Sequence, residues 1–358
     1  LIGRLLHDSG SLADDQLAAL ATDSARVGTQ GGELDFALLV DGLDAEREQG
    51  ITIDVAYRYF SSARRRFIVA DCPGHEQYTR NMATGASTAD VAVVLVDARK
   101  GLLSQTRRHS TIVRLLGLKR VVLAVNKMDL IDWDEARFRG IVADYRALAN
   151  ELGIDEVHAI PLSALRGDNV LGTSLNTPWF EGRSLLATLE ALPALTPSTA
   201  AGFRLPVQWV NRPHQDFRGV VGTVASGRVR VGDVVQVLPA GTRATVARVI
   251  GPGRDLSEAI AGQPVTLVFN EDVDVSRGDV IAALDAAPAL ATRLRADLVW
   301  LDIAPLAVGQ RYALRLGPKQ VHASVVSVEH VRDVHTGGTH GSAQLALNAI
   351  GRVELALE

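Results

Sequence analysis

The chain has 358 residues, of which 47% are hydrophobic and 22% are charged, so it is long enough for two or three domains with ordinary buried cores. No apolar run reaches the roughly 20 residues that a membrane helix needs, and no signal peptide opens the sequence. Cys72 is the single cysteine, which excludes an intrachain disulfide and fits the cytoplasm. The net charge of -4 gives no general basic surface, which weighs against a protein whose main role is to hold nucleic acid.

Strand-like and helical segments alternate up to about residue 195. Four short apolar runs, several of them rich in valine, are typical of strands buried on both faces of a parallel sheet. Helical patterns separate them, notably at residues 105–116 and 133–152. This order predicts a doubly wound α/β domain with a mostly parallel sheet. The expected strands are residues 67–71, 91–97, 121–126 and 158–162.

A short basic run, Arg64–Arg66, lies between two strand-like segments. This position favours a solvated hairpin turn, because turns between strands are polar and exposed. A contact with phosphate is the less favoured alternative.

The pattern changes after residue 195. Residues 193–206 are rich in Pro, Ala, Ser and Thr and have no helical or strand period, which indicates a linker. Beyond them, short valine-rich strands are punctuated by Gly-Asp turns at Gly232 and Gly278, and a second break follows near residues 286–291. We therefore expect the α/β domain at residues 1–195 and two small β-barrel domains at 203–286 and 292–358.

The first candidate site segment is Asp71-Cys72-Pro73-Gly74-His75, at the carboxyl end of an expected strand. Ligands of open α/β sheets bind beyond the carboxyl ends of the strands, so Asp71 is placed to hold Mg²⁺ through water. Gly74 allows the backbone to approach a γ-phosphate with no side chain in the way. Taken alone, the motif is equally compatible with a Pro-Gly turn after any strand.

A second motif, Asn126-Lys127-Met128-Asp129, ends a later strand. The carboxylate of Asp129 can accept hydrogen bonds from N1 and N2 of guanine, whereas adenine offers no matching donors there. The aliphatic stem of Lys127 can lie over the base plane. The alternative is a solvated polar loop, which the buried strand before the motif disfavours.

Two weaker motifs accompany these. Ser163 and Ala164 follow another strand, and their small side chains would let a backbone N–H reach O6 of guanine. Thr52, in the segment Gly50–Ile53, has a hydroxyl that can complete Mg²⁺ coordination when a γ-phosphate is present, as in an order–disorder switch. Each motif is weak alone, but the ordered set indicates a guanine-nucleotide site.

The sequence lacks one motif that such a site requires. No Gly-x-x-x-x-Gly-Lys-Ser/Thr phosphate loop occurs in the 358 residues, although Leu1–Leu6 look like the helix that follows one. We therefore expect the first strand and the phosphate loop to lie upstream of Leu1. The alternative, a relic that no longer binds nucleotide, is disfavoured by the intact guanine and γ-phosphate motifs.

These motifs resemble those of the translation-factor GTPases, and further stretches are similar to the large subunit of sulfate adenylyltransferase. The similarity covers almost the whole chain and is weakest over residues 320–358. Cys72 departs from the adenylyltransferase pattern, which commonly has threonine there, while elongation factors often have cysteine. The stretches resembling the GTPases are residues 1–6, 46–54, 71–75 and 126–129, and those resembling the adenylyltransferase are 54–60, 76–88, 105–109 and 216–219.

The resemblance implies a P-loop-type GTPase domain that binds and hydrolyses GTP with Mg²⁺. It also implies a heterodimer with a smaller ATP-binding subunit, in which GTP hydrolysis drives formation of adenosine 5′-phosphosulfate and pyrophosphate from ATP and sulfate. His75 would orient the attacking water, while Thr52 and Asp71 would hold Mg²⁺. The implied GTP-binding residues are Asp71, Cys72, Pro73, Gly74, His75, Asn126, Lys127, Met128, Asp129, Ser163 and Ala164.

Two other functions use the same nucleotide motifs. One is an elongation-factor-like GTPase that carries aminoacyl-tRNA, and the other is a scaffold that does not hydrolyse GTP. Residues 54–60 and 76–88, together with the acidic charge balance, favour the sulfate enzyme over the tRNA carrier.

Overall fold

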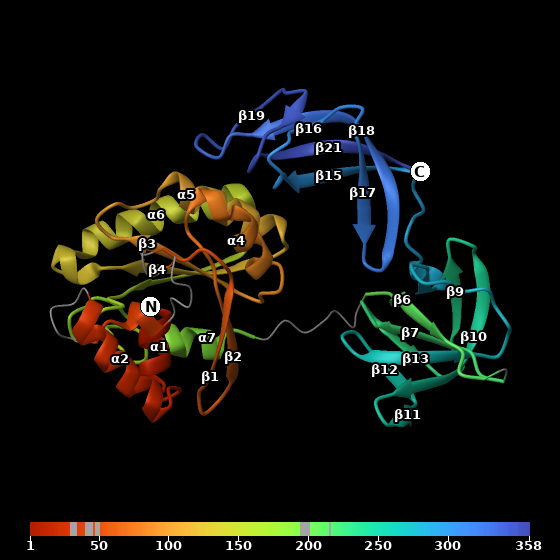
Figure 1. Cartoon of the computed structure of the whole chain (residues 1–358), viewed down its shortest axis with the longest axis horizontal. Coiled ribbons are helices and arrows are strands. Elements are labelled where there is room, and N and C mark those ends of the chain that lie inside the picture. Colours follow the sequence, from red (N-terminus) through yellow and green to blue (C-terminus); the bar gives the residue numbers. More distant parts are fainter. Residues whose placement is uncertain (29–33, 40–45, 47–50, 194–200, 215) are drawn as a thin grey trace.

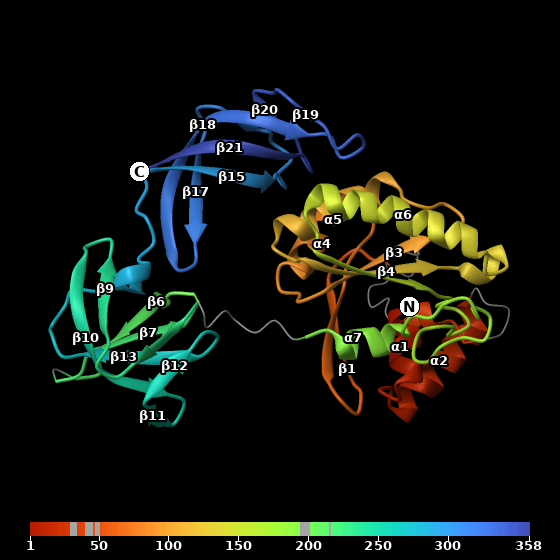
Figure 2. The same cartoon turned by 180° about the vertical axis from the view of Figure 1, so that it is seen from behind.

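The computed structural model describes residues 1–28, 34–39, 46, 51–193, 201–214 and 216–358. An α/β unit occupies the first half of the chain, and two all-β units follow it (Figures 1 and 2). Of the linker expected at residues 193–206, residues 194–200 lie outside the described residues, and residues 204–206 belong to the strand Arg204–Asn211, so the linker ends earlier than predicted.

The α/β unit is built on a parallel sheet with the strand order β3-β4-β5. Its central strand is fully buried because helices cover both faces. Val121, Leu123 and Val125 pack toward α5 and α6, whereas Val122 and Ala124 pack toward α7. Three of the four expected strands are thus confirmed in a parallel sheet. Their bounds are β3 (Ala92–Asp97), β4 (Arg120–Asn126) and β5 (Glu156–Pro161).

The expected helices are also present. The patterns at residues 105–116 and 133–152 correspond to α5 and α6, and α6 is capped by the Asp134 carboxylate, which accepts from Arg137 N, and ends at Gly153 (φ 73°). No helix in the described ranges is both long and apolar enough to cross a membrane. The helices are α1 (Ile2–Asp8), α2 (Asp14–Val27), α4 (Thr79–Ala86), α5 (Ser104–Leu115), α6 (Glu135–Leu152) and α7 (Leu185–Ala191), with short 3₁₀ turns at η1 (Phe36–Leu39), η2 (Glu76–Tyr78), η3 (Met128–Ile131) and η4 (Leu284–Ala286).

The fourth expected strand does not join the parallel sheet, so that prediction is wrong. Among the described residues, β2 (Arg66–Asp71) pairs with β1 (Ala56–Ser61) alone, in an antiparallel hairpin. β2 also differs from the central strand in its burial, because one face alone is covered: Phe67 and Val69 pack against α1, while Ile68 on the other face is 69% exposed. An uninterrupted apolar run therefore does not distinguish a central strand from a one-sided hairpin.

Helix α4 lies close against the end of this hairpin, at Cys72. A Cβ added at Gly85 would lie 2.4 Å from Cys72 Sγ, so only glycine allows the helix to approach. Burial, and then the charge of Asp71, raise the pKa of the Cys72 thiol to about 11. The thiol is therefore protonated at neutral pH, and it acts as a small packing group.

Replacing Gly85 by alanine should destabilise the protein by about 1–3 kcal/mol, because overpacking at Cys72 outweighs the better helix propensity of alanine. Urea unfolding midpoints measure the effect, and the double variant G85A/C72A should recover most of the loss. Gly140→Ala in α6, where an added Cβ meets nothing within 4 Å, is the matched control and should be neutral or stabilising. Equal stability of the Gly85 and Gly140 variants would contradict this packing.

The second unit is a closed six-stranded antiparallel barrel. Its strands follow the order β10-β13-β7-β6-β14-β9, and β9 pairs back onto β10. The expected Gly-Asp turns are present, with Gly232 (φ 92°) and Gly278 (φ 96°) in the left-handed region that favours glycine. The barrel strands are β6 (Arg204–Asn211), β7 (Gly219–Thr223), β9 (Val234–Leu238), β10 (Thr242–Gly251), β13 (Pro264–Phe269) and β14 (Val280–Ala283), with short strands β8 (Arg228–Arg230), β11 (Arg254–Leu256) and β12 (Glu258–Ile260) beside them.

The third unit is a curved sheet with the order β15-β21-β18-β17, and no ladder in the described residues closes it by joining β17 to β15. Instead, a β16–β20 ribbon covers it, and the core lies between the two, with Leu306 and Leu345 from the ribbon against Val325 and Val353 from the sheet. Only the first of the two expected barrels is therefore closed by hydrogen bonds. The strands are β15 (Arg293–Val299), β16 (Leu306–Ala307), β17 (Arg311–Leu316), β18 (Lys319–Arg332), β19 (Thr339–His340), β20 (Gln344–Leu345) and β21 (Ile350–Leu357).

Candidate functional site

The carboxyl ends of the parallel strands bring the predicted base-binding residues together. Asp97, the last residue of β3, is in register with Asn126, the last residue of β4. β5 ends at Pro161, two residues before Ser163. Polar side chains from three strands therefore meet at one edge of the sheet, where ligands of α/β proteins bind.

Asn126 links the second and third of these strand ends. Its Oδ1 accepts one hydrogen bond from Lys127 N (2.8 Å) and one from Ala164 N (2.9 Å). The Ala164 N–H, which the sequence suggested for O6 of guanine, thus already donates to Asn126 in this structure. Asn126 joins the two loops that were predicted to hold the base.

Loss of the Asn126 amide should therefore leave two backbone donors without their acceptor. We expect Asn126→Ala to destabilise the protein by about 1–3 kcal/mol, because two hydrogen bonds of roughly 0.5–1.5 kcal/mol each are lost. Thermal or urea unfolding measures this, and Asn126→Asp, which keeps an acceptor oxygen at the same place, should lose less. Equal losses for the two variants would show that the bridge does not hold the loops.

Lys127 turns the chain away from the strand with a left-handed backbone (φ 65°). Its half-exposed side chain reaches back, with Nζ 3.3 Å from Asp97 Oδ2. Asp97 also pairs with Arg99 at 2.6 Å, and the pKa of its carboxyl lies well below the usual range because of the hydrogen bonds from Arg99, with Lys127 adding to the effect. Asp97 therefore stays ionised and holds the ammonium group of Lys127 beside the strand ends.

Asp129 has the most unusual environment in this group. Its side chain is only 5% exposed, yet no donor in the described parts of the chain makes a hydrogen bond to its carboxylate. Its ion-pair contact there is with Arg166 Nε, at 3.8 Å from Oδ2, which is too long for a hydrogen bond. Because a buried carboxylate without donors is costly, this group is poised to accept hydrogen bonds from a ligand.

The loop that begins at Ser163 is held by its own contacts. Ser163 is fully buried, and its Oγ accepts from Arg166 N (3.2 Å). Arg4 of α1 donates to the carbonyl oxygens of Ala164 and Leu165. The loop is therefore fixed from two sides before any ligand arrives, which lowers the entropic cost of binding.

The segment Asp71–His75 continues from β2. Pro73 is buried, whereas Gly74 is exposed and an added Cβ there would meet nothing within 4 Å. The Gly74 carbonyl accepts from Gln105 Nε2 (3.4 Å), which ties it to α5. His75 is exposed and caps η2, with Nδ1 accepting from Gln77 N (3.4 Å). Its Nδ1 is therefore engaged in the cap, while the ring as a whole is exposed next to Gly74.

Thr52 lies in a segment that is tied to the helix after His75. The Glu46 carboxylate accepts from Ile53 N (2.9 Å), and Asn81 of α4 donates to Ile53 O (2.8 Å). Gly50, predicted as part of the same motif, lies outside the described residues. Nowhere in the described ranges do three His, Cys, Asp or Glu side chains cluster as metal ligands. Any Mg²⁺ here would depend on phosphate and water as further ligands, as this ion commonly does.

The C-terminal sheet contacts the segment after His75. Asn348 Nδ2 donates to Glu76 O (3.1 Å), and Arg80 donates to Leu301 O (2.8 Å). The Glu76 carboxylate also pairs with Arg108 of α5 at 2.6 Å. A cleft of about 330 Å³ lies between the two units. It is lined by Gln77, Tyr78, Arg80, Asn81, Leu301, Ile303, Leu347 and Asn348.

Two contacts around the site, those of Asp97 and Asn348, were not found from the sequence, and neither was one buried histidine of α5. Asp97 ends a strand in register with Asn126, and this position was the signal that could have revealed it. Asn348 acts across 272 residues and has no local signal. His109 of α5 has a buried Nε2 with no partner in the described structure, and burial, with a contribution from Arg108, lowers the pKa of its ring to about 4. It is therefore neutral at physiological pH.

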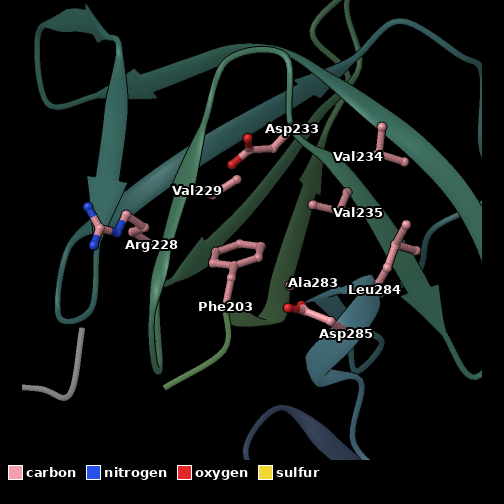
Figure 3. Close-up of a pocket in the computed structure, with 9 residues that line it drawn as sticks. All are labelled: Phe203, Arg228, Val229, Asp233, Val234, Val235, Ala283, Leu284 and Asp285. Atoms are coloured by element: carbon pink, nitrogen blue, oxygen red, sulfur yellow. The ribbon is translucent and has the colours of Figure 1, made fainter. Parts of the chain in front are cut away.

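A separate small cavity opens on the six-stranded barrel (Figure 3). It has a volume of about 210 Å³, and Phe203, Val229 and Val235 form its apolar base. Asp233 and Asp285 are the carboxylates among the residues that line it. None of the predicted nucleotide-binding residues lines this cavity, so it is not part of the candidate site.

Known proteins resemble this chain over its full length. It is 58% identical to the bifunctional enzyme CysN/CysC of Xylella fastidiosa, covering 100% of this chain but 58% of that protein. It is 54% identical to sulfate adenylyltransferase subunit 1 of Vibrio parahaemolyticus and 53% identical to that of Photobacterium profundum, covering 75% of each. Crystal structures of sup35 with GMPPNP and with GDP align over 99% of the chain at 22% identity, with TM-scores of 0.41 and 0.43.

A family model described as the elongation factor Tu GTP binding domain matches residues 1–205. The α/β unit, with its Asp71–His75 and Asn126–Asp129 motifs, is thus that of a translation-factor-type GTPase. Within this class, the chain belongs to the sulfate adenylyltransferase subunit 1 family. This confirms the resemblance seen in the sequence and supports it over the elongation-factor alternative.

Proposed function

We propose that this chain binds and hydrolyses GTP as a subunit of sulfate adenylyltransferase. It would couple hydrolysis to the formation of adenosine 5′-phosphosulfate and pyrophosphate from ATP and sulfate. The observation that carries the nucleotide assignment is the Asp129 carboxylate, which is nearly buried and accepts no hydrogen bond in the described structure. Guanine N1–H and N2–H are the donors that this carboxylate lacks, and adenine does not supply them.

The other residues of the site take complementary roles in this proposal. The stem of Lys127 lies over the base. Met128, the first residue of η3, is fully buried and anchors that turn, and Ser163 and Ala164 line the opposite side of the base pocket. Asp71, Cys72, Pro73 and Gly74 form the backbone beside the γ-phosphate. Thr52 and Asp71 hold Mg²⁺, which neutralises charge on the phosphates when bound.

His75 orients the attacking water and stabilises the charge that develops during phosphoryl transfer. Its exposed ring, capping η2 next to an unobstructed Gly74, supports this role. Little proton abstraction is needed before the phosphoryl group leaves, so the position of the ring matters more than its basicity.

The proposed division of labour has two further parts. The α/β unit at residues 1–195 turns over GTP, the β units at 203–286 and 292–358 follow it in the chain, and a smaller ATP-binding subunit completes the heterodimer. The adenylylation site lies on that subunit. A cytoplasmic location fits the single cysteine, Cys72.

The decisive experiment measures GTP hydrolysis by the full-length protein with and without the smaller subunit, ATP and sulfate. We expect hydrolysis to rise only when all three are present, and adenosine 5′-phosphosulfate formation to fall when GTP is withheld. If the rate of GTP hydrolysis did not change on adding the subunit and sulfate, and if the protein retained aminoacyl-tRNA, the elongation-factor function would be favoured. Failure to bind GTP at all would favour a scaffold.

A further inference from the structure

The outer face of the β1–β2 hairpin carries exposed aromatic and aliphatic side chains that the nucleotide site does not use. Tyr59 and Ile68 lie directly opposite each other and are 68% and 69% exposed. Tyr57 lies two residues before Tyr59, on the same side of the ribbon, and is 41% exposed. Three large side chains thus form one continuous exposed strip.

The inner face of the same hairpin is firmly packed. Phe60 is 3% exposed and stacks on Phe67, with ring centroids 4.7 Å apart, and both pack against Leu5 and Leu6 of α1. Because one face is fixed to the α/β unit, the strip on the other face is presented on a rigid support. Such preorganisation reduces the entropy lost when a partner binds.

The basic run predicted as a solvated turn lies at the end of this strip, and only part of it is solvated. Arg65 is not: it donates to the carbonyl oxygens of Leu189 (3.1 Å) and Leu192 (2.6 Å) at the end of α7, which anchors the hairpin tip. Arg64 and Arg66 are exposed and make no ion pair with any described residue. Arg66 lies opposite Ser61, on the outer face with Tyr59.

We propose that this outer face is the docking surface for the smaller subunit, and we call it the tyrosine face: Tyr57, Tyr59, Ile68, Arg64 and Arg66. The proposal rests on the proposed function, which requires such a subunit. Tyrosine and arginine are enriched in protein interfaces, where an aromatic anchor is buried and its rim stays polar. The charge at one end specifies the partner surface: an apolar patch bordered by carboxylates.

Nucleic acid is the other class of partner that tyrosine and arginine can bind. Two free guanidinium groups neutralise few phosphates, and the chain as a whole has a net charge of -4. The aliphatic side chain of Ile68, at the centre of the strip, also suits an apolar protein surface better than a stacked base. The observations therefore favour a protein partner.

The test measures binding of the full-length protein to the smaller subunit by surface plasmon resonance, with GTP affinity measured in parallel. Tyr59→Ser combined with Ile68→Ser should weaken the complex by roughly 30-fold or more, because two anchors are removed. Arg64→Glu combined with Arg66→Glu should slow association, and the defect should shrink at high salt. GTP affinity should not change in either variant.

A control variant with two exposed leucines replaced separates docking from a general effect of removing surface apolar side chains. Leu175 in the α/β unit is 97% exposed and Leu316 in the C-terminal sheet is 80% exposed, and L175S/L316S should bind the subunit as the wild type does. If both tyrosine-face variants bound the smaller subunit as tightly as the wild type does, this proposal alone would be overturned. No binding by the wild type would overturn the proposed function and this proposal together. If the wild type bound RNA and the two variants did not, the partner of this face would be nucleic acid, and the proposal of a protein partner would be wrong.

Discussion

Replacing Asp129 by asparagine should lower GTP affinity by roughly 100-fold or more and raise affinity for xanthosine triphosphate by a similar factor. In the proposed site the buried carboxylate accepts from N1 and N2 of guanine, whereas an amide would place a donor where guanine also has one. Xanthine carries an oxygen at that position, which suits the amide N–H. Competition between the two nucleotides for the full-length protein measures the shift.

A nearby carboxylate provides the control for this experiment. Asp132 lies in the same loop, three residues on, but its side chain is exposed and its backbone is left-handed (φ 50°), a conformation that asparagine tolerates. Asp132→Asn should therefore leave nucleotide preference unchanged. If Asp129→Asn kept full selectivity for guanine, the base would have to lie elsewhere.

His75→Ala should reduce the rate of GTP hydrolysis by roughly 100- to 1,000-fold while GTP affinity changes by no more than about threefold. In the proposed mechanism the ring acts only on the water and on charge that develops in the transition state, so its loss should affect turnover and not binding. Single-turnover hydrolysis and equilibrium binding are the two measurements.

The exposed His340, in the C-terminal sheet, is the matched control, and His340→Ala should hydrolyse GTP at the normal rate. A His75 variant whose affinity falls as much as its turnover would show that the ring helps to hold the nucleotide. The role assigned to it here would then be wrong.

Local patterns predicted much of the fold because the relevant forces are local. The buried valines of β4, the cap at Asp134 and the left-handed glycines at Gly232 and Gly278 each leave a signature within a few residues. The meeting of the two loops that are proposed to hold the base was also predictable, since strand ends in a parallel sheet must meet at one edge. Asn126 and Ala164 do meet there.

The features that escaped prediction depend on which segments pack together. Nothing in the run around Ile68 reveals that a helix covers one face only, so the hairpin was assigned to the wrong sheet. The alignment of Lys127 with Asp97 and the contact of Asn348 with Glu76 depend on tertiary placement across many residues. Side-chain pairing of this kind is set by the whole fold and leaves no periodic trace in the sequence.

The hydrogen bonds between the C-terminal sheet and the segment after His75 share one property: both acceptors, Glu76 O and Leu301 O, belong to the main chain. The identity of residues 76 and 301 can therefore drift during evolution without breaking either link. Hydrogen bonds weaken steeply with distance and angle, however, so a small shift of the peptide path would weaken both links. The connection thus depends on the path of the main chain at residues 76 and 301 and on the donor side chains of Asn348 and Arg80.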